Sequence, residues 1–143
     1  MKKFIATMLL AATAIAAHAQ TPPKFKWIVL ATSQDKTTVY SAANETIQIA
    51  KNDANIDVVL TLGKVTHNKQ TEMFEWYVTI ADCQRGFGTL RYLDTNGTWK
   101  FNVEYANDSH TLASDTAEQM CKWALAEAAP AAKPSGSKST GTV

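Results

Sequence analysis

The sequence has no excess of charge of one sign and no hydrophobic run long enough to cross a membrane. Its formal net charge is +1, from 14 basic and 13 acidic residues. Proteins that bind DNA, RNA or anionic lipid depend on a basic excess. A single apolar run, over residues 4–17, is shorter than the about 20 residues that span a bilayer. The composition therefore argues against a nucleic-acid partner and against stable membrane insertion.

Cysteine is nearly absent, with only Cys83 and Cys121 in the chain. In an oxidising compartment, two cysteines most simply form one structural disulfide. Closure of the loop between Cys83 and Cys121 contributes about 4 kcal/mol of stability in the chain-entropy model. Two free thiols or a redox pair are the alternatives. Redox pairs normally have two residues between the cysteines, so the spacing favours the structural bridge.

Sequence motifs of catalytic, metal and phosphate sites are also missing. Residues 53–57 begin like a calcium-binding loop, but Val58 and Lys64 occupy the positions that need glycine and glutamate. His67 and His110 have no second ligand at metal-binding spacing. No nucleophile elbow, glycine-rich phosphate loop or zinc-protease motif occurs. We therefore predict a protein that is not an enzyme, with no catalytic residues, no metal and no cofactor.

The N-terminus has the three parts of a secretory signal peptide. Lys2 and Lys3 precede the apolar run, and Ala17-His18-Ala19 supplies the small residues of a cleavage site. Export with removal of residues 1–19 is the prediction, to the periplasm or to the exterior and cell surface. Because Gln20 rather than cysteine follows the cut, we expect no lipid anchor at the new N-terminus.

Alternating apolar residues and β-branched residues predict a β-rich domain. Expected strands cover residues 26–32, 37–41, 46–49, 56–65, 73–80, 89–93 and 98–105. Asn96-Gly97 is typical of a tight hairpin turn, whereas residues 66–72 are expected to form a loop. Short connections between successive strands favour an antiparallel meander.

Two of these strands have clear faces. In residues 56–65, the alternation of Ile56, Val58, Leu60 and Leu62 predicts that their common face is buried. In residues 73–80, the face with Phe74, Trp76, Val78 and Ile80 is more apolar than the face with Met73, Glu75, Tyr77 and Thr79.

The period changes from two to about 3.6 near Ser114, which predicts a C-terminal helix. Ser114 or Asp115 can cap it, apolar residues then recur at helical spacing, and Pro130 ends it. We expect the helix to dock on the sheet through its Cys121 face. The predicted fold is therefore α+β, an antiparallel meander with one C-terminal helix packed on it and closed by the disulfide. It occupies residues 26–129, between a spacer over 20–25 and a disordered tail over 130–143.

Aromatic residues are the remaining candidates for a contact surface. Tyr77 lies on the less apolar face of its strand and could form a patch with Tyr92 or Tyr105. Trp123 lies off the apolar stripe of the helix, so we expect partial exposure. Ordinary pairing of aromatic side chains across neighbouring strands is the alternative interpretation.

Four segments, in this order, resemble the surface-adhesin protein E family. They are W-I-V-L and T-V-Y within Trp27–Tyr40, I-A-D-C-Q-R at Ile80–Arg85, L-R-Y-L-D-T-N-G at Leu90–Gly97, and S-D-T-A-E-Q-M-C at Ser114–Cys121. The resemblance spans roughly residues 26–123. This chain departs from the family in three ways. It has no lipid-attachment cysteine, it has Ser41-Ala42 where an aspartate is expected soon after the tyrosine, and it has Thr111-Leu112-Ala113 where Pro-Gly is usual.

The resemblance implies an antiparallel sheet with a C-terminal helix tied to it by the cysteine pair. It also implies binding of proteins, since family members include adhesins for extracellular-matrix and serum proteins. No binding residues can be transferred, because the shared motifs contain no known site. We therefore expect a non-enzymatic binding protein whose partner is a host matrix or serum protein or a bacterial envelope protein. A periplasmic structural protein, or an inhibitor of an envelope hydrolase, is the alternative.

Overall fold

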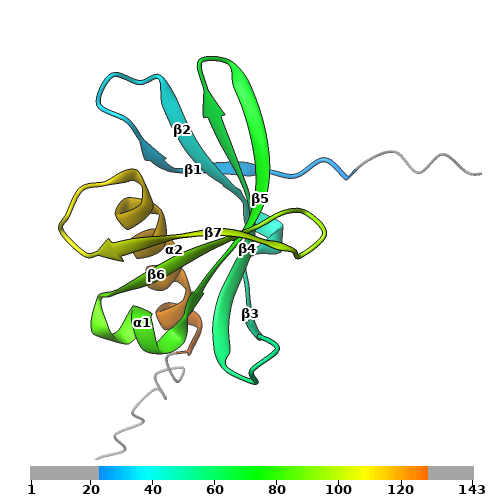
Figure 1. Ribbon diagram of the computed structural model, residues 1–143, viewed down its shortest axis with the longest axis vertical. Helices are drawn as coiled ribbons and strands as arrows, with labels where there is room; N and C mark the ends of the chain where they lie inside the picture. Colours follow the sequence, from blue (N-terminus) through cyan, green and yellow to red (C-terminus); the bar gives the residue numbers. More distant parts are fainter. Residues whose placement is uncertain (1–22, 129–143) are drawn as a thin grey trace, which may run out of the picture.

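The computed structural model describes residues 23–128, in which one antiparallel sheet carries a long helix on one face (Figure 1). The predicted signal peptide (1–19), the first part of the spacer (20–22) and the tail (130–143) lie outside the described residues. The strands are β1 (Trp27–Thr32), β2 (Thr38–Ala43), β3 (Gln48–Lys51), β4 (Asp57–His67), β5 (Gln70–Thr79), β6 (Phe87–Leu93) and β7 (Trp99–Ala106). The α-helices are α1 (Ile80–Arg85) and α2 (Leu112–Ala128), and a 3-10 turn spans Asn44–Thr46.

The sheet follows the order β1-β2-β4-β5-β6-β7, and β3 pairs separately with β4. The long strand β4 has two neighbours on the same side, because β2 pairs with its residues 63–67 and β3 with its residues 57–60. Every pairing is antiparallel. The predicted fold class, an antiparallel sheet with a C-terminal helix packed on it, is confirmed.

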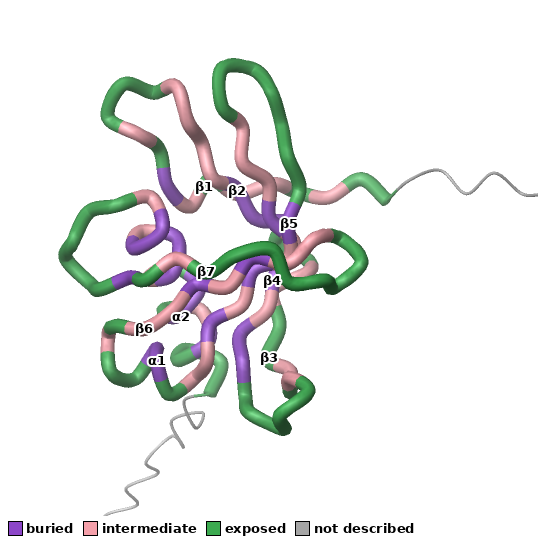
Figure 2. Tube along the Cα trace, viewed as in Figure 1, coloured by how far each residue is buried: buried purple, intermediate pink, exposed green. Residues whose placement is uncertain are grey.

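The hairpin between β4 and β5 is longer than predicted. Residues 66–72 are not a loop, since β4 continues to His67 and β5 begins at Gln70. Asn68 and Lys69 alone make the turn, with φ angles of 47° and 70°. Two consecutive residues with positive φ match the right-handed twist of the strands. The polar residues predicted as loop are the exposed end of the hairpin, shown in green in Figure 2.

A short helix replaces the predicted end of the 73–80 strand and the bend that follows it. The Thr79 hydroxyl accepts a hydrogen bond from the Asp82 N–H at 3.1 Å, which caps the first turn of α1. Gly86, with φ of 78°, ends the helix in the left-handed conformation that glycine favours. Thr79 followed three residues later by Asp82, together with Gly86, is the sequence signal that could have revealed α1.

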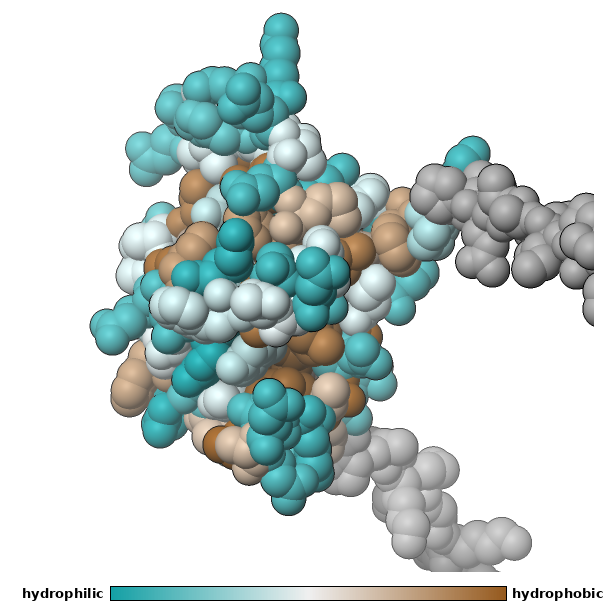
Figure 3. Space-filling view, turned by 45° about the vertical axis from the view of Figure 1, so that its right-hand side comes forward, coloured by the Kyte–Doolittle hydropathy of each residue, from teal (hydrophilic) through white to brown (hydrophobic). Residues whose placement is uncertain are grey.

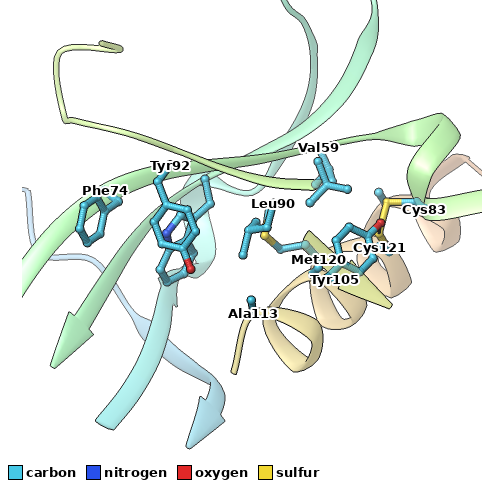
Figure 4. Close-up of a cluster of buried hydrophobic side chains, with 13 residues drawn as sticks. Val59, Phe74, Cys83, Leu90, Tyr92, Tyr105, Ala113, Met120 and Cys121 are labelled. Atoms are coloured by element: carbon cyan, nitrogen blue, oxygen red, sulfur yellow. Dashed lines mark hydrogen bonds between the residues drawn. A yellow bond between two sulfur atoms is a disulfide. The ribbon is translucent and has the colours of Figure 1, made fainter. Parts of the chain in front are cut away.

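The hydrophobic core lies between α2 and one face of the sheet (Figure 4). Ala117, Met120 and Ala124 of α2 are almost completely buried, and the small alanines allow the helix to lie close to the strands. The sheet contributes Val59, Phe74, Trp76, Val78, Leu90, Tyr92 and Tyr105. Burial of this face accounts for the periodicity of α2 and for the face predicted for β5.

The predicted disulfide is confirmed. Cys83 of α1 and Cys121 of α2 are bonded, with their Cα atoms 5.1 Å apart. Both cysteines are about 6% exposed, so the bridge lies at the border of the core. It joins the two α-helices directly and thereby ties the β5–β6 connection to the end of the chain.

The prediction for the faces of β4 is wrong for three of its four residues, since only Val58 is buried, at 3% exposure. The face toward α2 carries Val59 and Gly63, whereas Leu60 and Leu62 lie on the opposite face and are only half-buried. Ile56 lies before the strand and is 46% exposed. Both faces of this segment carry apolar residues, so alternation alone could not identify the face that the helix would cover. As a result, apolar side chains of β4 lie on the side of the sheet that α2 does not cover.

Candidate protein-binding surface

The sheet face opposite α2, called the open face below, is formed mainly by β4, β5 and β6. The register places Leu60 opposite Tyr77, and Leu62 opposite Glu75. Residues directly opposite each other in antiparallel strands point to the same side of the sheet. On the next strand, Leu93 lies opposite Glu75, and Arg91 lies opposite Tyr77. The open face therefore carries a continuous group of leucine, tyrosine, glutamate and arginine side chains.

Aromatic rings and cations also contact each other on this face. The Arg91 guanidinium lies 5.3 Å from the centre of the Tyr77 ring. The Lys64 ammonium lies 4.3 Å from the centre of the Trp27 ring. Cation–π interactions of this kind are modestly stabilising at exposed positions. Aromatic residues and arginine are enriched in protein interfaces, whereas lysine is depleted.

A groove crosses the open face and is called the Glu75 groove. It consists of two hollows of about 440 Å³ and 380 Å³, which share Leu60 and Glu75. Its apolar lining comprises Val58, Leu60, Leu62, Met73, Tyr77 and Leu93. The turn at residues 52–54 and the turn at residues 95–97 border it. Figure 3 shows hydrophobic surface on this side of the molecule, between hydrophilic projections.

The structure does not bring the four candidate aromatics together. Tyr77 lies on the open face, half-buried beneath Arg91. Tyr92 and Tyr105 are 1% and 4% exposed and belong to the core. Trp123 is half-buried on α2, where it lines a separate hollow of about 240 Å³ with Ile28 and other residues. Of the predicted contact residues, Tyr77 alone lies in the Glu75 groove.

The two core tyrosines are held in their neutral form. Burial, followed by a hydrogen bond with Tyr40, raises the pKa of Tyr92 far above its usual range. Burial and the nearby Asp82 carboxylate raise the pKa of Tyr105 to about 12. This is the expected effect, because desolvation disfavours the charged form of a phenol.

Sequence reasoning missed Leu60, Leu62 and Leu93 as surface residues. The signal was present in residues 58–62, where apolar residues occupy both parities of one strand. A strand that is apolar on both sides contacts a partner on both sides or leaves one apolar face exposed. The missing information was the position of α2, which covers only one face of the sheet.

Several kinds of site are absent from residues 23–128. No group of three or more His, Cys, Asp or Glu residues is arranged to hold a metal ion within this part of the chain. His67 contacts the Thr38 hydroxyl at 2.7 Å and thus links β4 to β2, while His110 lies in the connection between β7 and α2, with φ of 52°. No helix in the described part is long and apolar enough to cross a membrane.

The segments that resemble the surface-adhesin protein E family occupy distinct elements. I-A-D-C-Q-R forms α1, L-R-Y-L-D-T-N-G forms most of β6 and the turn after it, and S-D-T-A-E-Q-M-C lies in the first half of α2. The remaining segment, within Trp27–Tyr40, lies in β1 and β2. No family model, curated protein or solved structure matches the chain.

Proposed function

We propose that this protein is an exported, non-enzymatic protein-binding module of the surface-adhesin protein E type. The observation that carries the proposal is the open face, where apolar and aromatic side chains lie without a covering helix among residues 23–128. Contiguous apolar surface with a polar border is characteristic of interaction sites. The partner is a protein of the host matrix or serum, or of the bacterial envelope.

Binding suits this surface better than catalysis does. Two carboxylates, Glu75 and Asp53, line the groove, and no histidine lines it. Asp53 is exposed in the turn at residues 52–54, whereas the acid and base of a hydrolase are normally held in fixed positions on either side of the scissile bond. The two cysteines form the disulfide and supply no thiolate nucleophile.

A matched pair of substitutions tests the proposal. Met73 on the open face and Leu125 on α2 are each 38% exposed. We expect Met73→Asp to reduce capture of the partner by about ten-fold, since a charge in the apolar contact costs more than 1.4 kcal/mol. Leu125→Asp introduces the same charge at equal exposure on the opposite side of the molecule and should leave capture unchanged.

The measurement is affinity capture with the immobilised mature chain, from envelope extract and separately from serum and matrix proteins. Captured proteins are quantified for the wild type and for both variants, after circular dichroism has shown that all three are folded. Equal capture by the two variants would refute the open face as the binding surface. Absence of any specific partner in both sources would refute the binding function.

A further inference from the structure

Glu75 is a carboxylate in an apolar setting. It lies in the middle strand of the open face, opposite Leu62 on one side and Leu93 on the other. The two hollows of the groove meet at this residue. One of its carboxylate oxygens lies 4.0 Å from the position that a Cβ would take at Gly97. The carboxylate therefore lies at the centre of the groove and is directed toward the β6–β7 turn.

This carboxylate has no partner among residues 23–128. It takes part in none of the hydrogen bonds or ion pairs of that part of the chain, although its side chain is half-buried. A carboxylate without a partner can accept a charge-assisted hydrogen bond from a cation that another molecule supplies. The structure thus holds an acceptor that residues 23–128 leave unused.

The neighbouring cations are engaged elsewhere. Lys51, which borders the groove, forms an ion pair with Asp57 at 2.8 Å. Arg91 lies over Tyr77, and Lys64 lies over Trp27. Asp53 adds a second acidic residue to the border of the groove. The charged residues that line the groove are one cation, Lys51, and two carboxylates, Asp53 and Glu75, beside the apolar lining. The groove is therefore complementary to an apolar segment with a positive charge.

The shape of the groove suits a segment of polypeptide. Its two hollows are adjacent and meet at Leu60 and Glu75, so successive side chains of one segment can enter both. Each hollow is of the size that takes up small organic groups. A segment with one long cationic side chain between apolar ones would place its charge at the junction and its apolar groups in the hollows.

We propose that the Glu75 groove binds a partner-protein segment in which one lysine or arginine, flanked by apolar residues, pairs with Glu75. The proposal rests on the protein-binding function and names the chemistry of its partner. A charge-assisted hydrogen bond forms between the cation and the carboxylate. The apolar neighbours of that cation contact Leu60, Leu62 and Met73. The low net charge of the protein makes this local pair, rather than long-range attraction, the source of selectivity.

The first test uses phage-displayed random short peptides selected on the full mature chain. We expect the selected peptides to share one lysine or arginine between apolar residues. By fluorescence anisotropy, replacement of that residue with glutamine should weaken binding about ten-fold. Glu75→Gln should abolish this preference. Glu104→Gln is the matched control, because Glu104 is exposed on β7 outside the groove, and it should retain the preference.

Thermal unfolding provides an independent readout. Because Glu75 has no partner in residues 23–128, Glu75→Gln should leave the Tm unchanged or raise it. A lowered Tm would show that Glu75 already has a stabilising partner within the protein, which would overturn the proposal. Selected peptides without a shared cation, or failure to select any peptide, would also overturn it. The binding function itself would survive these results if capture still depended on Met73, so the two failures are distinguishable.

Discussion

At the scale of single residues, the centre of the core depends on the absence of a side chain. Trp76 is fully buried, and its indole stacks on Tyr40 with ring centres 5.5 Å apart. The same indole covers Gly63 of β4, so closely that a Cβ at this position would overlap the ring. Gly63 is therefore required by close approach rather than by an unusual backbone angle.

Gly63→Ala should lower the free energy of unfolding by about 1–3 kcal/mol, because the added methyl group overpacks the core. Urea denaturation monitored by tryptophan fluorescence measures this change. In a Trp76→Leu background the smaller side chain leaves room, so the additional cost of Gly63→Ala should largely disappear. Equal costs in the two backgrounds would show that the indole does not determine the need for glycine.

Tyr105 makes a residue-scale prediction about pH. Its pKa is raised to about 12 in the folded state by burial and by the Asp82 carboxylate, whereas an unfolded tyrosine has a pKa of about 10. The neutral phenol is thus favoured by folding. Its contribution to stability is complete below about pH 10 and is lost as the pH rises through about 12.

A pH-jump titration followed by tyrosinate absorbance should show a group that ionises near pH 12 in the folded protein. Tyr105→Phe should remove this component from the titration. Stability measured in urea should fall between pH 10 and 12 in the wild type and fall less in the variant. Ionisation of every tyrosine near pH 10 while the protein remains folded would contradict the prediction.

At the scale of secondary-structure elements, α1 is too short to be stable alone. A helix of six residues lies well below the length at which isolated helices form in water. Asp82 pairs with Arg85 and accepts a hydrogen bond from the Thr89 N–H at 3.3 Å, which joins α1 to β6. Cys83 then joins α1 to α2. The helix is therefore stabilised by these contacts rather than by its own intrinsic stability.

Loss of the disulfide should therefore act on α1 first. Cys83→Ala with Cys121→Ala should lower the free energy of unfolding by about 4 kcal/mol, given a sequence separation of 38. Amide hydrogen exchange should accelerate in α1 more than in β4 and β5. Reduction of the wild type should reproduce the effect, and reductant should not affect the variant. Uniform acceleration over the whole sheet would contradict this order of opening.

At the scale of the whole molecule, the two sheet faces have different roles. One face is covered by α2 and forms the core, and the other carries the Glu75 groove, which is the surface that we propose for a partner. A rigid sheet loses little conformational entropy when it binds. The near-neutral charge of the chain gives no long-range steering, so the proposed recognition would depend on contacts within the groove.

The elements that could be predicted from sequence are those with a local cause. β5 alternates strictly, so the burial of Phe74, Trp76 and Val78 followed from its pattern. The periodicity of α2 likewise indicated that Cys121 would face the sheet. α1 was missed because its six residues are too few to show a period. Tyr92 and Tyr105 were misplaced because tyrosine is compatible with either face of a strand.

The sequence by itself determined the antiparallel strands, the C-terminal helix and the cysteine pairing, because each depends on residue spacing and on having only two cysteines. Tertiary structure alone decided which face of β4 is covered, since apolar residues lie on both of its faces and one helix can cover only one. It also decided the surroundings of Glu75. Leu62 of β4 and Leu93 of β6 lie opposite Glu75 on its two sides, and spacing along the chain does not reveal neighbours that only pairing across the sheet creates.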